Sequence, residues 1–121
     1  MEALEYVTAL QPQLATIAVF EFAANNLADP APRVKWESAR VISNISHAFP
    51  EQANHVVPQL LENATHSGTV VRWSASTALA QIFSIPGIQH PGLVIQLQAL
   101  LENEPKSSIQ KIYERAIRKK G

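Results

Sequence analysis

The sequence contains no cysteine, and this absence excludes disulfide bonds and thiolate chemistry. Glycine is scarce, with four residues in 121, and ten basic side chains balance ten acidic ones, so the formal net charge is zero. A neutral chain carries no global field that would attract nucleic acid or an anionic membrane. Because a reducing compartment suits a cysteine-free chain, we expect a soluble cytoplasmic protein.

Long apolar runs are also missing. The longest, around Leu14 to Ala24, is interrupted by Glu21 and is too short to span a bilayer. The opening residues, MEALEYVTAL, are acidic where a signal peptide would be basic, so we expect neither secretion nor a membrane anchor. A length of 121 residues, 46% of them hydrophobic, suits one domain with a real core and is too short for two ordinary domains.

The sequence does contain regular helix punctuation. Prolines and glycines divide it into segments of helical length, and apolar residues within them recur at spacings of three and four, as in Val71, Ala75, Ala78, Leu79 and Ile82. No segment shows the sustained alternation of a strand. We therefore predict an all-α fold, with helices at 2–10, 12–27, 33–47, 51–65, 69–84, 90–103 and 106–119.

Three segments repeat with a period near 37 residues. VKWESARVISNI (34–45) aligns with VRWSASTALAQI (71–82) at a shift of 37, which places Trp36 on Trp73. IQKIYERAIRKK (109–120) aligns with the second copy at a shift of 38. The pattern predicts a single domain of residues 1–121 with three helix pairs, in repeats near 12–48, 50–85 and 90–120, after an extra N-terminal helix in 1–11.

The motif V-[RK]-W-x-[SA], which opens a helix rich in small residues after a proline or polar turn, resembles the HEAT repeat. DPAPRVKWESARVI (29–42) is the closest match, and the resemblance covers roughly residues 12–120. It implies a HEAT-like solenoid of the armadillo-like class, a right-handed α-α superhelix whose second helices line the concave side. The third copy departs from the motif, with Gln110 and Lys111 in place of the Arg and Trp.

The sequence offers no catalytic constellation. Its histidines, His47, His55, His66 and His90, do not form a His-Glu-x-x-His pattern, and no cysteine can complete a zinc site. A glycine-rich phosphate loop and a nucleophile elbow are both missing. We therefore expect no enzymatic activity, no metal and no cofactor.

Equivalent positions in the repeats form rows, and two rows have competing interpretations. Trp36 and Trp73 either lie over the adjacent repeat or form binding anchors on the concave side; we favour the structural role. Lys35, Arg72 and Gln110 form the second row. There the resemblance implies a tie between neighbouring turns, with Asp29 as the candidate partner.

Two more rows place polar residues on the predicted inner helices, where packing gives no reason for them. These rows are the best candidates for a partner surface. With the two tryptophans, the candidate partner-binding residues are Arg40, Asn44, Thr77, Gln81, Arg115, Lys119, Trp36 and Trp73.

Charge is unevenly distributed although it sums to zero. Residues 106–121 carry six basic side chains, with Glu114 as their acidic neighbour. Cations in the last turns of a helix complement its dipole, and that interpretation is favoured here. The same side chains would also form a basic end surface for an acidic partner.

The leading functional hypothesis is a non-enzymatic scaffold or adaptor whose inner helices bind a protein or peptide. The alternative is nucleic-acid binding by basic residues of those helices, which Glu37 and Glu114 would interrupt. These basic residues are Lys35, Arg40, Arg72, Arg115 and Lys119. A third hypothesis makes the chain part of a longer solenoid, or lets it self-associate through an uncovered face of the first helix that carries Leu4, Val7 and Leu10.

Overall fold

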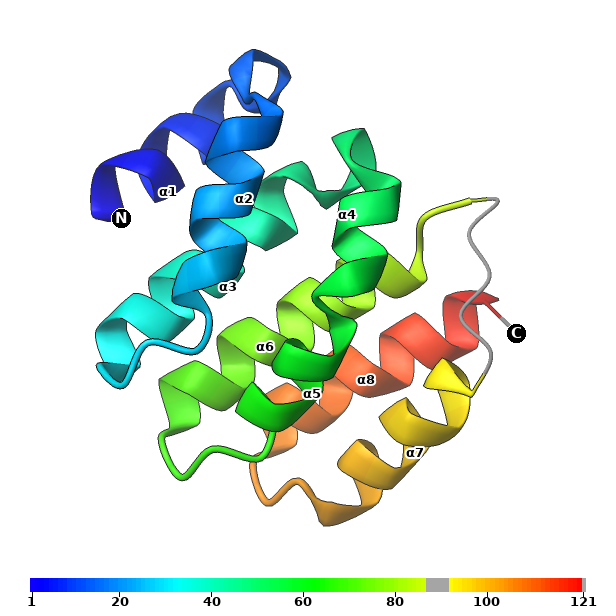
Figure 1. The fold of residues 1–121 in the computed structure, drawn as a ribbon. Coiled ribbons are helices and arrows are strands. Elements are labelled where there is room, and N and C mark those ends of the chain that lie inside the picture. The colour runs from blue at the N-terminus through cyan, green and yellow to red at the C-terminus, as the bar shows by residue number, and fades with distance from the viewer. Residues whose placement is uncertain (87–91, 121) are drawn as a thin grey trace.

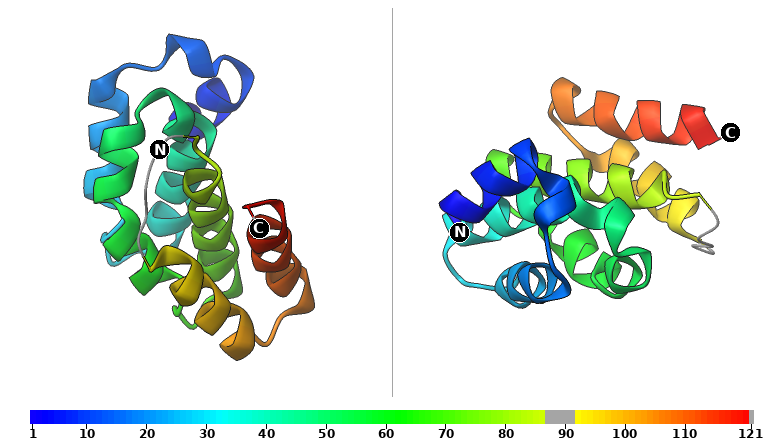
Figure 2. Two further views of the ribbon diagram at one scale, coloured as in Figure 1. Left: turned by 90° about the vertical axis from the view of Figure 1, so that its right-hand side faces the viewer. Right: turned by 90° about the horizontal axis from the view of Figure 1, so that it is seen from above.

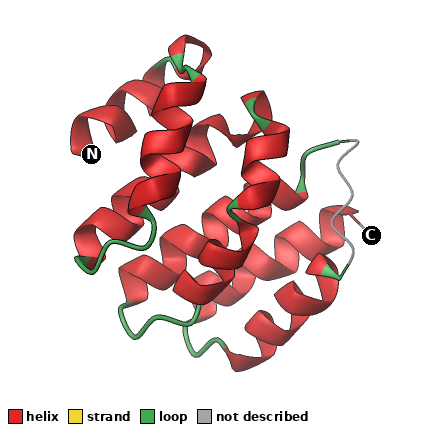
Figure 3. Ribbon diagram, viewed as in Figure 1, coloured by secondary structure: helices red, strands yellow, loops and turns green. Residues whose placement is uncertain are grey.

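The computed structural model describes residues 1–86 and 92–120, and every regular element within them is a helix (Figures 1 and 3). The all-α prediction is therefore confirmed for this part of the chain. The predicted start of a helix at residue 90 lies outside the described residues. The helices are α1 (Glu2–Leu10), α2 (Ile17–Asn26), α3 (Pro32–Ile45), α4 (Pro50–His55), α5 (Val57–Asn63), α6 (Thr69–Phe83), α7 (Leu93–Asn103) and α8 (Ser107–Lys120), with 3-10 turns at Pro12–Leu14 and Ser46–Ala48.

Two of the predicted helices are interrupted. The continuous helix predicted at 12–27 is wrong because Thr16 is extended and its hydroxyl accepts a 3.4 Å hydrogen bond from Val19 N, so that α2 begins there. The helix predicted at 51–65 divides at Val56 into α4 and α5. Pro58 has no N–H for the carbonyl four residues earlier, and it is accommodated in the first turn of the new helix.

The helices are arranged in two layers (Figure 2). In the inner layer α1, α3, α6 and α8 pack on one another in that order, so that α1 and α8 lie at its two ends. In the outer layer α2 packs on α3, α5 on α6 and α7 on α8. Each predicted helix pair therefore supplies one inner helix, and the inner helices carry the three aligned repeat segments.

Helix α6 lies at the centre of the core, between α3 and α8 and against α5. Its predicted apolar face, Val71, Ala75, Ala78, Leu79 and Ile82, is at most 2% exposed. Because two residues of this face are alanine, the neighbouring helices can approach closely. The face thus confirms the helical periodicity read from the sequence.

A side-chain hydrogen bond joins the first two repeats. Asn63 at the end of α5 is buried and donates from Nδ2 to the carbonyl of Leu27, 36 residues earlier, at 3.0 Å. The corresponding Asn103, at the end of α7, is exposed and donates to Ala99 of its own helix at 2.8 Å. The same sequence motif, LLEN, therefore serves as a connector in one repeat and closes its own helix in the other.

Helix α1 is covered on one side only. Leu4 is half-buried against the core, which corrects its place in the expected uncovered face, whereas Val7 and Leu10 are 48% and 63% exposed. Tyr6 lies beside them and is 68% exposed. No helix in the described part of the chain is both long and apolar enough to cross a bilayer.

Candidate functional site

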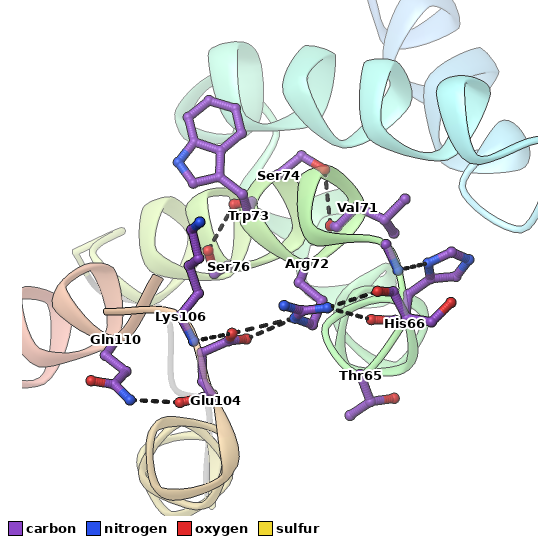
Figure 4. Close-up of polar contacts among 12 residues, drawn as sticks. Thr65, His66, Val71, Arg72, Trp73, Ser74, Ser76, Glu104, Lys106 and Gln110 are labelled. Carbon is purple, nitrogen blue, oxygen red and sulfur yellow. Dashed lines mark hydrogen bonds and ion pairs between the residues drawn. The ribbon is translucent and has the colours of Figure 1, made fainter. Parts of the chain in front are cut away.

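Arg72, in the first turn of α6, ties two turns of the structure together (Figure 4). Its Nε lies 3.1 Å from Oε1 of Glu104, and its Nη1 donates to the carbonyls of His66 and Ser67 at 3.1 and 3.0 Å. Glu104 also accepts from the N–H of Lys106 at 3.0 Å. The ion pair is almost completely enclosed, because the side chains of Arg72 and Glu104 are 13% and 2% exposed. Arg72 therefore has the structural role that its row predicted.

The partner predicted for this row, Asp29, is wrong. Its Oδ1 accepts from the N–H of Ala31 at 2.9 Å, so it shapes its own turn, whereas Arg72 reaches forward to the turn between α7 and α8. Gln110, the third member of the row, donates from Nε2 to the carbonyl of Glu104 at 2.6 Å. Two members of the row thus meet at Glu104, a residue that the sequence reasoning did not single out.

Tyr113 of α8 is 1% exposed, and its hydroxyl has no hydrogen-bond partner within the described residues. Its removal from water raises its pKa above the usual range, and the negative charge of Glu104 adds to this effect while Arg72 opposes it. Tyr113 therefore remains a neutral phenol under alkaline conditions in which an exposed tyrosine ionises.

This shift makes the stability of the protein depend on alkaline pH. The unfolded chain loses the phenol proton near pH 10, while the folded protein retains it, so the free energy of unfolding should fall above about pH 10 and be unaffected by this group at lower pH. The contribution to the slope is up to about 1.4 kcal/mol per pH unit. Urea unfolding at several alkaline pH values should show a shallower fall for Tyr113→Phe, and equal slopes in both proteins would contradict the assignment.

Trp73 lies over the neighbouring inner helix. The Cζ atom of Arg40, on α3, is 4.9 Å from the centroid of the Trp73 ring, which is the geometry of a cation–π contact. Arg40 also forms an ion pair with Glu5 of α1, although the geometry of this pair is not that of a hydrogen bond. This contact between repeats is the one that the structural interpretation of Trp73 predicts. Trp36 occupies the equivalent position on α3 and is half-buried.

Asn44 is engaged by α1 as well. Its Nδ2 donates to the hydroxyl of Thr8 at 3.1 Å and to the carbonyl of Glu5 at 3.3 Å. The expectation that packing gives no role to Arg40 and Asn44 is therefore wrong, because the extra N-terminal helix docks on both. Glu5 and Thr8 are three residues apart and share one face of α1, a spacing that could have signalled this contact.

Arg40 and Arg115 stand at equivalent repeat positions but have different surroundings, which gives a matched pair of variants. Arg40→Glu should lower the free energy of unfolding by about 1–2 kcal/mol, because it sets two carboxylates together and removes the contact with Trp73. Arg115→Glu, on an exposed position, should change it by less than about 0.5 kcal/mol. Urea unfolding of both variants is the measurement, and equal losses would contradict the distinction.

One open groove between α6 and α8 brings together the four polar candidates not yet described, which are Thr77, Gln81, Arg115 and Lys119. Its volume is about 420 Å³. The apolar part of its wall, called the floor below, consists of the small or aliphatic side chains of Ala80, Ile112 and Ala116. The groove is lined by Thr77, Ala80, Gln81 and Ser84 of α6 and by Ile112, Arg115, Ala116 and Lys119 of α8.

The rim of the groove is cationic. Arg115 and Lys119 lie one turn apart on α8, both are exposed, and neither has a carboxylate partner within the described part of the chain. No acidic side chain is among the described residues that line the groove. The sequence indicated four of its polar members but neither Ser84 nor the apolar part of its wall, since Ala80, Ile112 and Ala116 look like ordinary helix residues in the sequence.

Ser84 of the groove forms one contact of a kind used in catalysis, with His47, which does not line the groove. Oγ of Ser84 lies 3.3 Å from Nε2 of His47, but the hydroxyl donates to the carbonyl of Gln81 at 2.7 Å. The shorter contact of the hydroxyl is thus the one with the carbonyl of Gln81, and no carboxylate forms an ion pair with His47 within the described residues to orient it as a base. Among the described residues, no three His, Asp or Glu side chains are grouped closely enough to hold a metal ion; His90 lies outside them.

No protein-family model, curated protein or solved structure matches this chain.

Proposed function

We propose that this chain is a HEAT-like helical-repeat module that binds a protein or peptide in the groove between α6 and α8. The observation that carries the proposal is the groove itself, an open cavity of about 420 Å³ with a small apolar floor and two unpaired cations at its rim. Binding sites for ligands are commonly concave, largely apolar and supplied with a few polar groups of this kind. The module acts as a scaffold in the cytoplasm and performs no catalysis.

The repeat architecture is supported by two independent features. The aligned sequence segments fall on the successive inner helices α3, α6 and α8, and each of these packs against one helix of the outer layer. A stack of this kind buries each apolar face against its neighbour and leaves one side of the inner layer for recognition. We therefore propose that the two layers form the right-handed superhelix of the HEAT-like class.

Nucleic-acid binding has less support. Of the basic residues considered for it, Arg40 is paired with Glu5, and Arg72 is enclosed with Glu104. Lys35 is half-buried on α3 and does not line the groove. The cations left near the groove are Arg115 and Lys119, too few for the extended basic face that a duplex requires. A filter-binding assay at low salt separates the two functions, and retention of duplex DNA there would favour the alternative.

The proposal is tested by affinity capture with a matched pair of double variants. The protein and its Arg115→Glu/Lys119→Glu variant are used as baits in an extract of the source cell, and bound proteins are quantified by mass spectrometry. Lys111→Glu/Arg118→Glu is the control, because it makes the same charge change on α8 at exposed positions that do not line the groove.

We expect the specific partner to be retained by the control and lost by the groove variant. The same partner on all three baits would show that it binds elsewhere. Loss from both variants would show that the partner responds to the total charge of α8 rather than to the groove.

A further inference from the structure

Successive inner helices leave a valley between them, and the groove between α6 and α8 is the second of two equivalent valleys. The first lies between α3 and α6, has a volume of about 210 Å³, and is lined by Arg40, Ser43, Asn44, Trp73 and Thr77. The repeat shifts of 37 and 38 residues place Thr77, Ala80 and Gln81 at the positions of Arg40, Ser43 and Asn44. Those three line the second valley, which measures about 420 Å³.

The first valley contains an aromatic side chain that the second lacks. In the first valley the indole of Trp73 lies in the space between the helices and is stacked on the guanidinium of Arg40. Lys111 takes the position of Trp73 in the second valley, where it is exposed and does not line the groove. The α6–α8 groove therefore lacks the ring that fills its counterpart.

Arg115 lacks the neighbouring groups that its repeat equivalent, Arg40, contacts. The equivalent Arg40 has a carboxylate from Glu5 on α1 and the aromatic face of Trp73 beside it. Arg115 lines the open groove and has neither kind of neighbour within the described residues. Glu5 comes from the inner helix before α3, and the inner helix before α8 is α6, so the carboxylate beside Arg40 is the group whose equivalent place beside Arg115 falls in the groove.

We propose that the ligand of the groove is an acidic peptide segment that inserts one aromatic side chain between α6 and α8 and sets a carboxylate against Arg115 and Lys119. The aromatic ring takes the place that Trp73 takes in the first valley, over the floor of Ala80 and Ala116. This inference rests on the proposed function and specifies the chemistry of its partner. An aromatic side chain seated in a pocket is the usual anchor of such an interface, and the nearby cations add charge complementarity.

The inference is tested with a phage-displayed library of random dodecapeptides, selected on the intact protein. We expect the enriched peptides to share an aromatic residue with Asp or Glu close to it. Synthetic versions of these peptides should bind the original protein at least roughly tenfold more weakly when their aromatic residue is replaced by alanine. The unchanged peptides should lose a similar amount of affinity for the Arg115→Glu/Lys119→Glu protein. Fluorescence anisotropy measures both effects.

The outcomes separate this inference from the proposed function. Peptides that lose binding to the groove variant but share no aromatic and acidic residues would overturn the inference and leave the groove as a binding site. Peptides that bind the groove variant with the same affinity as the original protein would contradict both the inference and the proposed function. A selection that enriches no peptide would also overturn the inference.

A pair of substitutions at one position tests the filling of the valley directly. Lys111→Trp restores the ring found at Trp73 and should weaken binding of the enriched peptide by roughly tenfold, because the protein then occupies its own groove. Lys111→Ala removes the same charge without adding a ring and should leave binding within about twofold of the original protein. Equal affinities in the two variants would contradict the proposed aromatic site.

Discussion

Replacing Glu104 with alanine should lower the free energy of unfolding by about 3–5 kcal/mol, because the change leaves Arg72 as an enclosed and unpaired charge. The Glu104 side chain is 2% exposed and that of Arg72 is 13% exposed, so water can compensate little of the lost interaction. The substitution also removes the acceptor for the N–H of Lys106 in the turn before α8. Urea unfolding followed by circular dichroism gives the difference.

Two controls separate the ion pair from a general effect at this turn. Glu102→Ala removes an exposed carboxylate two residues earlier and should change stability by less than about 0.5 kcal/mol. Replacement of both Arg72 and Glu104 by leucine should restore part of the loss, since it removes the unpaired charge together with its partner. A Glu104→Ala protein as stable as the original would mean that the ion pair contributes nothing to the link between the second and third repeats.

Leu79→Ala should cost about 2–5 kcal/mol, the range expected when a buried leucine is truncated and a cavity remains. Leu79 is fully buried at the centre of α6, the helix that packs against α3, α5 and α8. Since these neighbours belong to all three repeats, we expect one cooperative transition that shifts as a whole. Thermal and urea unfolding measure the change.

Leu10→Ala is the matched control for this truncation. It makes the same chemical change at a position that is 63% exposed, and it should alter stability by less than about 0.5 kcal/mol. Similar losses at the two positions would contradict the placement of α6 at the centre of the core. Light scattering of the Leu10→Ala protein also tests self-association through α1, because an exposed leucine at an interface would change the apparent mass when removed.

Local patterns in the sequence predicted the helices better than their interruptions. The face of Val71, Ala75 and Leu79 follows directly from helical periodicity, since apolar residues at spacings of three and four can be buried together. The breaks at Thr16 and Val56 depend on capping and on a proline in a first turn, which compete with a periodic pattern that continues across them.

The candidate site was predictable where the repeats are self-similar and unpredictable where they differ. Four members of the polar rows, Thr77, Gln81, Arg115 and Lys119, lie on facing helices and line one groove. The ion pair of Arg40 could not be predicted from its repeat position, because its partner Glu5 lies on the N-terminal helix, outside the repeat. The groove itself could not be read from the sequence, because its lining depends on how α6 packs against α8.

The most direct test of the groove as the binding site is amide chemical-shift mapping of the isotope-labelled protein with the enriched peptide. We expect the largest shifts on α6 from Thr77 to Ser84 and on α8 from Ile112 to Lys119, with small changes in the outer helices α2 and α5. Largest shifts on the outer helices, or on the exposed face of α1 around Tyr6 and Leu10, would contradict it.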